Sequence, residues 1–427
     1  MHYWRNSIGM NTHLRTSALI AAGIVSAGSA AFAEEGRMSS VETALTSTTI
    51  SGYVSTSAFF DLQGNSGTPR LPGRVFDVPG NMDRINLDVV KLTIEKPLDE
   101  GDWSAGYKVD LLFGPDANIF GTSSVLGSGN QSDFTIKQAY VNLQTPIGND
   151  LTVKVGVFDT IIGYEVMESP NNPNFSRSYA YYIEPFQHTG ALLSYALTDW
   201  LSLNAGIANA WDTRINANPY YKGEPEELGI QTFMGSLAIT VPESAGFLSG
   251  TTVYGGIVSG LGSQQVQGFD ATTGDAITDG GRRNSYYAGA TIPTPLENLS
   301  VGLAYDYRTS EAYNAVTGNN GDQWAQTLGG YLSYKLTEQL KLNLRGEWAK
   351  GTAGTWAATP GTLGPQESEE LLGVTTTLDI SIWANVLARI EFRWDNDLAN
   401  TRAFGSTGID EADNNAFILG ANIVYKF

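Results

Sequence analysis

Near the end of the chain, positions 388–395 read ARIEFRWD, a strict alternation of apolar and charged side chains. Successive side chains of a β-strand point to opposite faces, so this stretch predicts a strand with one apolar face and one charged face. If the apolar face meets lipid, a slip of one residue would bury the arginines in the bilayer, at a cost of about 2–4 kcal/mol each near the midplane. The register of such a strand is therefore well specified.

The same alternation recurs in segments of about ten residues along most of the chain, with clear examples at 103–113, 151–157 and 299–308. Sixteen segments begin near Ile50, Arg84, Asp102, Phe134, Asp150, His188, Trp200, Gln231, Leu248, Asn284, Leu299, Trp324, Gln339, Glu370, Trp383 and Asn415. Repeated dyad alternation and an even strand number are typical of bacterial outer-membrane barrels. The sequence therefore predicts an all-β protein, a transmembrane antiparallel β-barrel of about sixteen strands.

The connections between these segments alternate between short and long. The short ones lie at 97–101, 146–150, 198–199, 242–247, 293–298, 337–338 and 379–382, and every connection between them is long. Outer-membrane barrels have short periplasmic turns and long extracellular loops, whereas a soluble sandwich has no reason to alternate in this way. The alternation predicts the orientation of the barrel.

Parity along the strands predicts two irregularities and one closure. The apolar positions change parity between Leu87 and Val90 and again between Ile136 and Ala139, which indicates either a β-bulge or an error in the assigned register. The last segment keeps one parity to Phe427. It must pair with the first strand, 51–61, because an open edge in lipid would leave backbone groups unsatisfied.

The first 33 residues predict a cleaved signal peptide. Arg5 and Arg15 precede an apolar run at 18–25. Small residues follow it and lead to Ala33. The run is shorter than the roughly 18 residues that a spanning helix needs. We expect residues 34–49 to be a polar periplasmic lead-in and residues 50–427 to form the barrel as one domain.

Composition removes several classes of function. A formal net charge of −19 argues against a nucleic-acid partner, and the absence of cysteine excludes disulfides, thiolate metal sites and cysteine nucleophiles. His188 is the only histidine after residue 33, and no G-x-S-x-G element accompanies it. We expect neither an enzyme nor a cofactor.

Three stretches carry a resemblance to a known family: GVFDTIIGYE at 156–165, NFSRSY at 174–179 and EPFQHTG at 184–190. They resemble the OmpL-like family of β-barrel porins of bacterial outer membranes. The resemblance implies a passive diffusion channel for small hydrophilic solutes and ions in a Gram-negative outer membrane, in contact with lipid and lipopolysaccharide. Porins of this size are commonly trimers, so it also implies a homotrimer.

The longest connection, residues 160–187, is the third long loop. In general porins the third loop folds into the barrel and narrows it, so the resemblance makes this loop the candidate constriction; an ordinary surface loop is the alternative. Its candidate charges are Glu165, Glu168, Arg177 and Glu184.

The inward parity of the strands adds five bases on the lumen wall: Lys108, Lys154, Arg345, Arg389 and Arg393. Facing the loop acids, they would set a transverse field that orients solutes and tunes ion selectivity. Alternatively, they pair with neighbouring acids and only solvate the lumen. Acids of the other long loops, Glu224, Glu226, Glu227, Asp270, Asp275, Asp279, Glu367, Glu369 and Glu370, are expected to attract cations to the outer mouth.

Two other functions fit the same pattern. A channel selective for sugars or anions would use the loop tyrosines and the wall arginines as a binding site. A structural or adhesive surface barrel would have a blocked lumen. A soluble secreted β protein is a third possibility, and it would extract without detergent.

Overall fold

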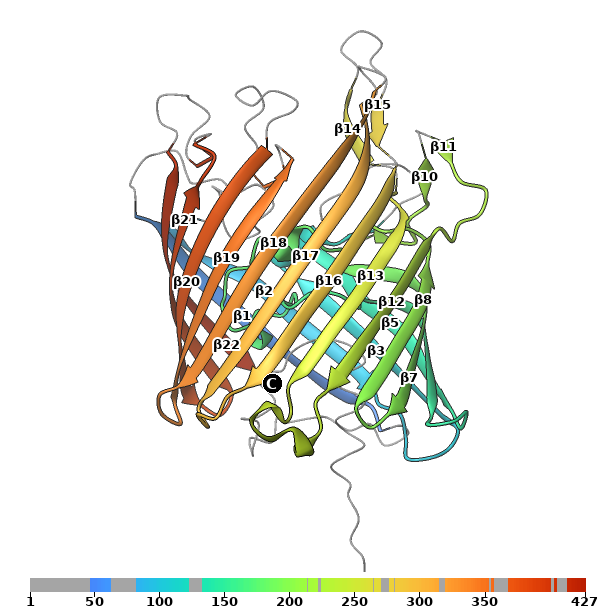
Figure 1. Cartoon of the computed structure of the whole chain (residues 1–427), viewed down its shortest axis with the longest axis horizontal. Coiled ribbons are helices and arrows are strands. Elements are labelled where there is room, and N and C mark those ends of the chain that lie inside the picture. The colour runs from blue at the N-terminus through green and yellow to red at the C-terminus, as the bar shows by residue number, and fades with distance from the viewer. Residues whose placement is uncertain are drawn as a thin grey trace, which may run out of the picture.

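The computed structural model describes residues 47–427 except 63–81, 123–132, 213, 222–223, 264, 270–275, 280, 315–318, 353–354, 357–367, 401–402 and 405–412. The signal peptide predicted at 1–33 and most of the lead-in predicted at 34–49 lie outside the described residues. Within the described part, sixteen antiparallel strands form one closed barrel (Figure 1), which confirms the predicted fold. In barrel order these strands are β1 (Thr49–Asp61), β2 (Arg84–Lys96), β3 (Ser104–Phe113), β5 (Phe134–Thr145), β6 (Leu151–Asp159), β7 (Gln187–Thr198), β8 (Leu201–Ala208), β12 (Thr232–Thr240), β13 (Thr252–Leu261), β16 (Arg282–Pro293), β17 (Leu299–Asn314), β18 (Asn319–Lys335), β19 (Leu340–Thr352), β20 (Ser368–Trp383), β21 (Val386–Asp397) and β22 (Asn415–Lys426).

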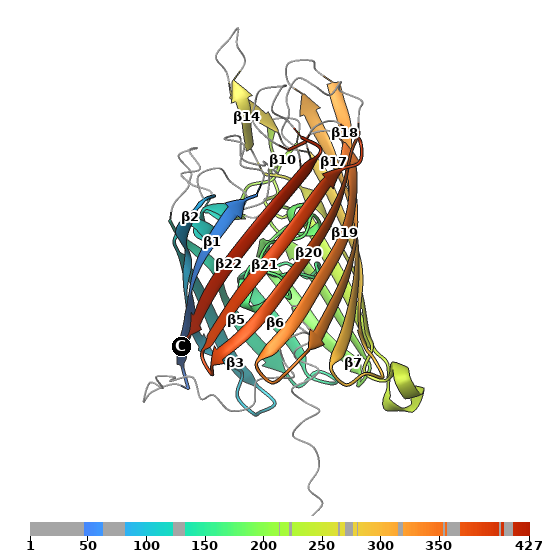
Figure 2. The same ribbon diagram turned by 90° about the vertical axis from the view of Figure 1, so that its left-hand side faces the viewer.

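The barrel closes between its first and last strands, as predicted. β1 pairs antiparallel with β22, and the two strands lie side by side in Figure 2. Beyond β22, the backbone of Phe427 continues the ladder: Gly52 N donates to Phe427 O at 2.9 Å, and Phe427 N donates to Gly52 O at 3.0 Å. Every strand of the barrel thus has a neighbour on both sides, which satisfies its backbone groups in lipid.

Short and long connections alternate around the barrel. The short turns lie at the lower end in Figure 1, and one of them contains the 3₁₀ helix η6 (Glu243–Leu248). The long connections carry small extra elements, namely η3 (Pro115–Ile119), β4 (Gly121–Thr122), η4 (Ser169–Asn171), η5 (Ala180–Tyr182), β9 (Arg214–Ile215), β10 (Tyr220–Tyr221), β11 (Glu224–Pro225), β14 (Gln265–Phe269) and β15 (Ala276–Asp279).

One long connection is shorter than expected. β17 and β18 stay paired up to Asn314 and Asn319, so most of the loop expected before Trp324 is strand. Beyond the lipid the apolar alternation is no longer required, so the ladder continues without the pattern that marks it in the sequence.

The two faces of the wall differ as the alternation predicts. Leu303, Ile390 and Phe392 point outward and are exposed, whereas Arg389 and Arg393 point inward and are buried. Among the described residues, no helix has the length and apolarity needed to cross a membrane.

Both predicted bulges are present. The β1–β2 register skips Asp88, and the β3–β5 register skips Lys137. In each case two consecutive side chains are buried, for example Lys137 together with Gln138. A bulge re-aims one side chain, so these two positions add a carboxylate and an ammonium to the interior that strict alternation would not place there.

Candidate functional site: the third loop inside the barrel

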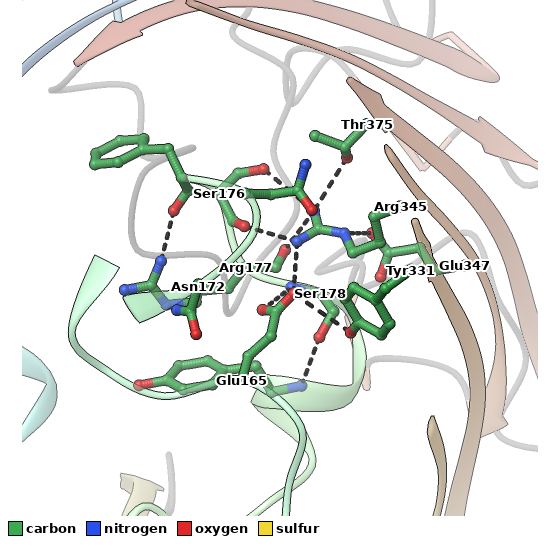
Figure 3. A network of polar contacts seen from close by, with 12 residues as sticks. Glu165, Asn172, Ser176, Arg177, Ser178, Tyr331, Arg345, Glu347 and Thr375 are labelled. Carbon is green, nitrogen blue, oxygen red and sulfur yellow. Dashed lines mark hydrogen bonds and ion pairs between the residues drawn. The ribbon is translucent and has the colours of Figure 1, made fainter. Parts of the chain in front are cut away.

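The connection from β6 to β7, residues 160–186, is called the third loop below. β19 lies eight strands from β6 in the ring of sixteen, which puts it on the opposite wall. Yet Arg345 of β19 donates from Nη1 to Glu165 Oε1 at 2.8 Å and to the carbonyl oxygen of Ser176 at 2.7 Å (Figure 3). The third loop therefore crosses the interior of the barrel instead of lying on its surface.

The arginines of the wall hold the backbone of the third loop. Arg389 Nη1 donates to the Ser169 carbonyl at 2.7 Å and Arg389 Nη2 to the Asn172 carbonyl at 3.0 Å. Arg393 Nη1 donates to the Arg177 carbonyl at 2.8 Å. These bonds join charged donors to buried carbonyls, which makes them stronger than bonds between neutral groups.

Carboxylates of the same wall accept from the amides of the loop. Glu391 accepts from the amide of Phe175 at 2.6 Å and from that of Ser176 at 3.0 Å. Glu347 accepts from the amide of Tyr179 at 2.5 Å. Acids and bases thus alternate on β19 and β21. The acids accept hydrogen bonds from successive amides of the loop backbone, and the bases donate to its carbonyls.

The wall arginines are also paired with carboxylates. Arg345 forms ion pairs with Glu165 at 2.8 Å and Glu347 at 3.1 Å. Arg393 pairs with Asp395 at 2.8 Å and Arg389 with Asp379 at 3.0 Å. All three arginines are at most 2% exposed. Buried charges need such compensation, because an unpaired one costs several kcal/mol.

Glu168 ties the loop to the other side of the barrel. Its carboxylate accepts from Lys91 of β2 at 2.6 Å and lies 2.9 Å from the ammonium of Lys137 of β5. Burial opposes ionisation of Glu168, but the charges of Lys137 and Lys91 outweigh it and hold its pKa well below the usual range. The two lysines were missed from the sequence, although the parity change between Ile136 and Ala139 marks the bulge that turns Lys137 inward.

Arg177 braces the loop from within. It donates to the carbonyls of Phe175, at 2.5 Å, and of Met167, and its guanidinium lies 5.5 Å from the ring centroid of Tyr181. Asn171 is the one exposed residue among 160–186, all of which the structure describes. The loop is a packed segment held on both sides.

Two of the predicted wall bases do not touch the loop in any described contact. Lys108 pairs with Glu95 at 3.3 Å, and its side chain is 24% exposed. Lys154 places its ammonium 4.5 Å from the ring centroid of Tyr140. Both have inward parity on their strands.

The remaining side of the loop faces strands β8, β12, β13 and β16, whose side chains at the cavity are uncharged. Ile162 lies over Gly256 of β13, where a Cβ atom would come within 2.6 Å of Ile162 Cγ2. Tyr164 stacks on Tyr331 of β18 at 4.1 Å between ring centroids. A cavity separates the loop from the wall here. Strands β8, β12, β13 and β16 line it with Asn204, Ser236, Leu237, Ala238, Tyr254, Gly255 and Tyr287, and the loop lines it with residues that include Glu165 and Glu184. Lys137 of β5 and Asp159 of β6, which pair with each other, complete the lining.

Other candidate groups are placed as follows. Glu369, expected at the outer mouth, is buried and accepts from the amide of Trp356 at 2.7 Å, so that expectation was wrong. Its position on β20 gives it inward parity, so its carboxylate faces the interior of the barrel. His188 is buried with Nε2 3.2 Å from Thr160 Oγ1. In the described part of the chain, no three acidic or histidine side chains are grouped to hold a metal ion.

Comparison with known proteins gives a family match and several similar structures. Residues 47–427 match the sequence profile of a family described as "Putative beta-barrel porin-2, OmpL-like". The fold is similar to that of the outer membrane channel DcaP of Acinetobacter baumannii, with a TM-score of 0.59, 10% identity, and coverage of 91% of this chain and 100% of that chain.

Two further structures have the same fold. The trimer form of OmpT from Vibrio cholerae gives a TM-score of 0.55 at 12% identity, covering 89% of this chain and 99% of that chain. An anion-selective porin from Comamonas acidovorans gives 0.54 at 12% identity, with coverage of 89% and 99%. No curated protein matches the chain significantly.

Proposed function

The chain belongs to the OmpL-like β-barrel porin-2 family and is an outer-membrane porin; from this premise we propose that small hydrophilic solutes and ions diffuse between the third loop and the uncharged wall of β8, β12, β13 and β16. One observation carries the proposal. The loop is gripped by the charged strands β19 and β21, and its other side borders the cavity. Uncharged wall side chains bind passing ions weakly, which favours diffusion over capture.

In this proposal the third loop is the constriction, and its candidate residues divide into two groups. Those that fix the loop are Glu165, Glu168, Arg177, Arg345, Arg389 and Arg393. Those that border the water path are Glu184, which lines the cavity, and Lys108 and Lys154, which have inward parity and do not touch the loop in any described contact. The ion pairs of the arginines favour the interpretation in which the wall charges neutralise one another, and they weaken the case for an open basic ladder.

The test is single-channel conductance of detergent-purified, folded protein in planar bilayers, with a reversal potential under a salt gradient. We expect stable openings whose current scales with salt, and a preference for cations, because the wall arginines are neutralised by carboxylates and acids such as Glu227 are exposed on the long loops. Protein that inserts but never conducts would overturn the diffusion pore. An anion preference would overturn the assignment of the arginines.

A blocked barrel with a structural or adhesive role is the second candidate. The third loop contacts strands almost all round the ring, through Phe175 stacked on Phe59 of β1, Ile162 on β13 and Arg345 on β19. The absence of conductance from folded protein would support this role. Saturation of the current by a sugar or an anion would instead support a substrate-selective channel.

Assembly and export follow the same reasoning. We infer a homotrimer embedded in outer-membrane lipid and lipopolysaccharide, because OmpT of Vibrio cholerae, which shares the fold, is described in a trimer form. The mass of the detergent-solubilised protein tests this inference. We also infer that residues 1–33 are removed on export, and sequencing of the N-terminus of the mature protein tests that cleavage.

A further inference from the structure

Two carboxyl groups meet where the third loop reaches β17. Glu184 of the loop and Asp306 of β17 interact directly and are 6% and 2% exposed. Neither forms an ion pair with a lysine or arginine within the described part of the chain. The two carboxyl groups hydrogen-bond to each other, and Glu184 Oε1 and both carboxyl oxygens of Asp306 have no other partner there. A buried pair of acids held only by its own hydrogen bond calls for an explanation.

The nearby bases serve other acids. Arg345 pairs with Glu165 at 2.8 Å, and Arg308, which follows Asp306 on the inward face, has Arg283 and Asp212 as its charged neighbours. Burial, followed by the adjacent Asp306, raises the pKa of Glu184 well above its ordinary value. Two adjacent carboxylates would repel each other strongly in a medium of low dielectric constant, so the pair either keeps a proton between its oxygens or takes a cation there.

Further unpartnered polar groups flank the pair. Tyr287 of β16, Asp306 of β17 and Thr327 of β18 are directly opposite one another in the sheet, on the lumen face. The hydroxyl groups of Tyr287 and Thr327 also lack partners, and both residues are at most 5% exposed. The site is therefore a row of oxygen atoms on the wall facing a carboxylate of the loop.

The adjoining cavity indicates what kind of cation fits. Glu184 and Tyr287 line it together with the apolar side chains of Ile161, Ile162 and Pro185. Lys137 and Asp159, which pair with each other, and Glu165, which pairs with Arg345, also line it, whereas Asp306 does not. Oxygen acceptors at one end and hydrocarbon alongside match a solute that has a cationic head and an apolar body. An ammonium group supplies three donors and no acceptor, which complements a set of free oxygens.

We propose that Glu184, with Asp306 beside it, binds the ammonium group of a cationic organic solute whose hydrocarbon part lies against Ile161 and Ile162. This inference rests on the proposed function, because the solute reaches the site through the pore. It adds to that function a solute class and a binding site inside the constriction.

The experiment replaces part of the potassium in the bilayer assay by n-butylammonium at constant ionic strength. We expect a saturable fall in current with the unmodified protein. Glu184→Gln and Asp306→Asn should each weaken half-saturation by at least about tenfold, because each removes a charge-assisted hydrogen bond. Glu227→Gln, which removes an exposed acid of another long loop, should leave half-saturation unchanged.

Several results would overturn the proposal. One is a fall in current that never saturates with n-butylammonium, and another is an unchanged response in both variants. A third is equal saturation by sodium, because the site would then bind inorganic cations. If the variants fail to fold, as judged by heat-modifiable mobility, the unmodified protein still decides: equal saturation by neutral n-butanol would refute the role of the carboxylates. A protein that does not conduct at all would refute the proposed function instead, so the two failures are distinguishable.

Discussion

Replacing Arg345 by glutamine should loosen the third loop from β19 while the barrel stays closed. The guanidinium donates to Glu165 at 2.8 Å and to the Ser176 carbonyl at 2.7 Å, both in the loop. It also pairs with Glu347 at 3.1 Å, in the wall. Glutamine keeps a polar group there but cannot span these partners, and it leaves the buried carboxylate of Glu165 without its counter-charge, while Glu347 keeps Arg393 at 3.0 Å.

The size of the effect follows from burial. Breaking a buried ion pair by removing one partner costs about 3–5 kcal/mol. Since each 1.4 kcal/mol is a factor of about ten, the ratio of docked to undocked loop should fall by at least about a hundredfold. Lys341→Gln is the matched control. It removes a lumen cation from the same strand, but Lys341 pairs with Asp379 of the wall at 3.3 Å with its side chain 23% exposed, and such a pair contributes about 1 kcal/mol or less.

Single-channel recording reads out the docking of the loop. Arg345→Gln should conduct in larger, noisier steps than the unmodified protein, and Lys341→Gln should keep the unmodified step. Heat-modifiable mobility establishes that both variants are folded. The reasoning would be refuted if Arg345→Gln kept the step size and noise of the unmodified protein and changed only the ion preference, because Arg345 would then be a charge of the open passage and not an anchor.

Two further predictions concern the other contacts of the loop. A Cβ atom at Gly256 would lie 2.6 Å from Ile162 Cγ2, and the chain has no cysteine of its own. The double variant Ile162→Cys with Gly256→Cys should therefore form a disulfide that lowers conductance until a reductant is added. Failure to cross-link would mean that this part of the loop does not lie on β13. Because the pKa of Glu168 is held below its ordinary 4.5, its contribution to stability is present above that value and is lost as pH falls through the lowered pKa. Glu168→Gln should therefore lower the heat-modification temperature at neutral pH, with a gap that narrows in strong acid; a gap independent of pH would contradict the pairing with the lysines.

The strands were predictable because each one has one face against lipid and the other toward the polar interior of the barrel. Alternation at 388–395 assigns Arg389 and Arg393 to the interior, and the structure buries both. The parity changes located the bulges at Asp88 and Lys137. These are local signals, readable from residues that are near neighbours in the chain.

The hydrogen bonds between the barrel wall and the backbone of the third loop could not be predicted from the sequence. Glu391 accepts from the amide of Phe175, and 216 positions separate the two residues. No local pattern encodes a contact between a side chain and a distant backbone amide. Strict alternation also does not say which way the inserted residue of a bulge points. It therefore could not predict that Lys137 pairs with Glu168.

The wall side chains that hold the third loop bind mainly its backbone. Arg389 donates hydrogen bonds to the carbonyls of Ser169 and Asn172, and Glu391 accepts from the amides of Phe175 and Ser176. A carbonyl is present whatever residue occupies a position, and an amide hydrogen is present for every residue except proline. Mutation can therefore change most side chains of the loop, other than Glu165, Glu168 and Arg177, without breaking these bonds. Solute preference is free to diverge between descendants of such a barrel, whereas substitutions at the few charged positions that hold the loop would weaken its attachment.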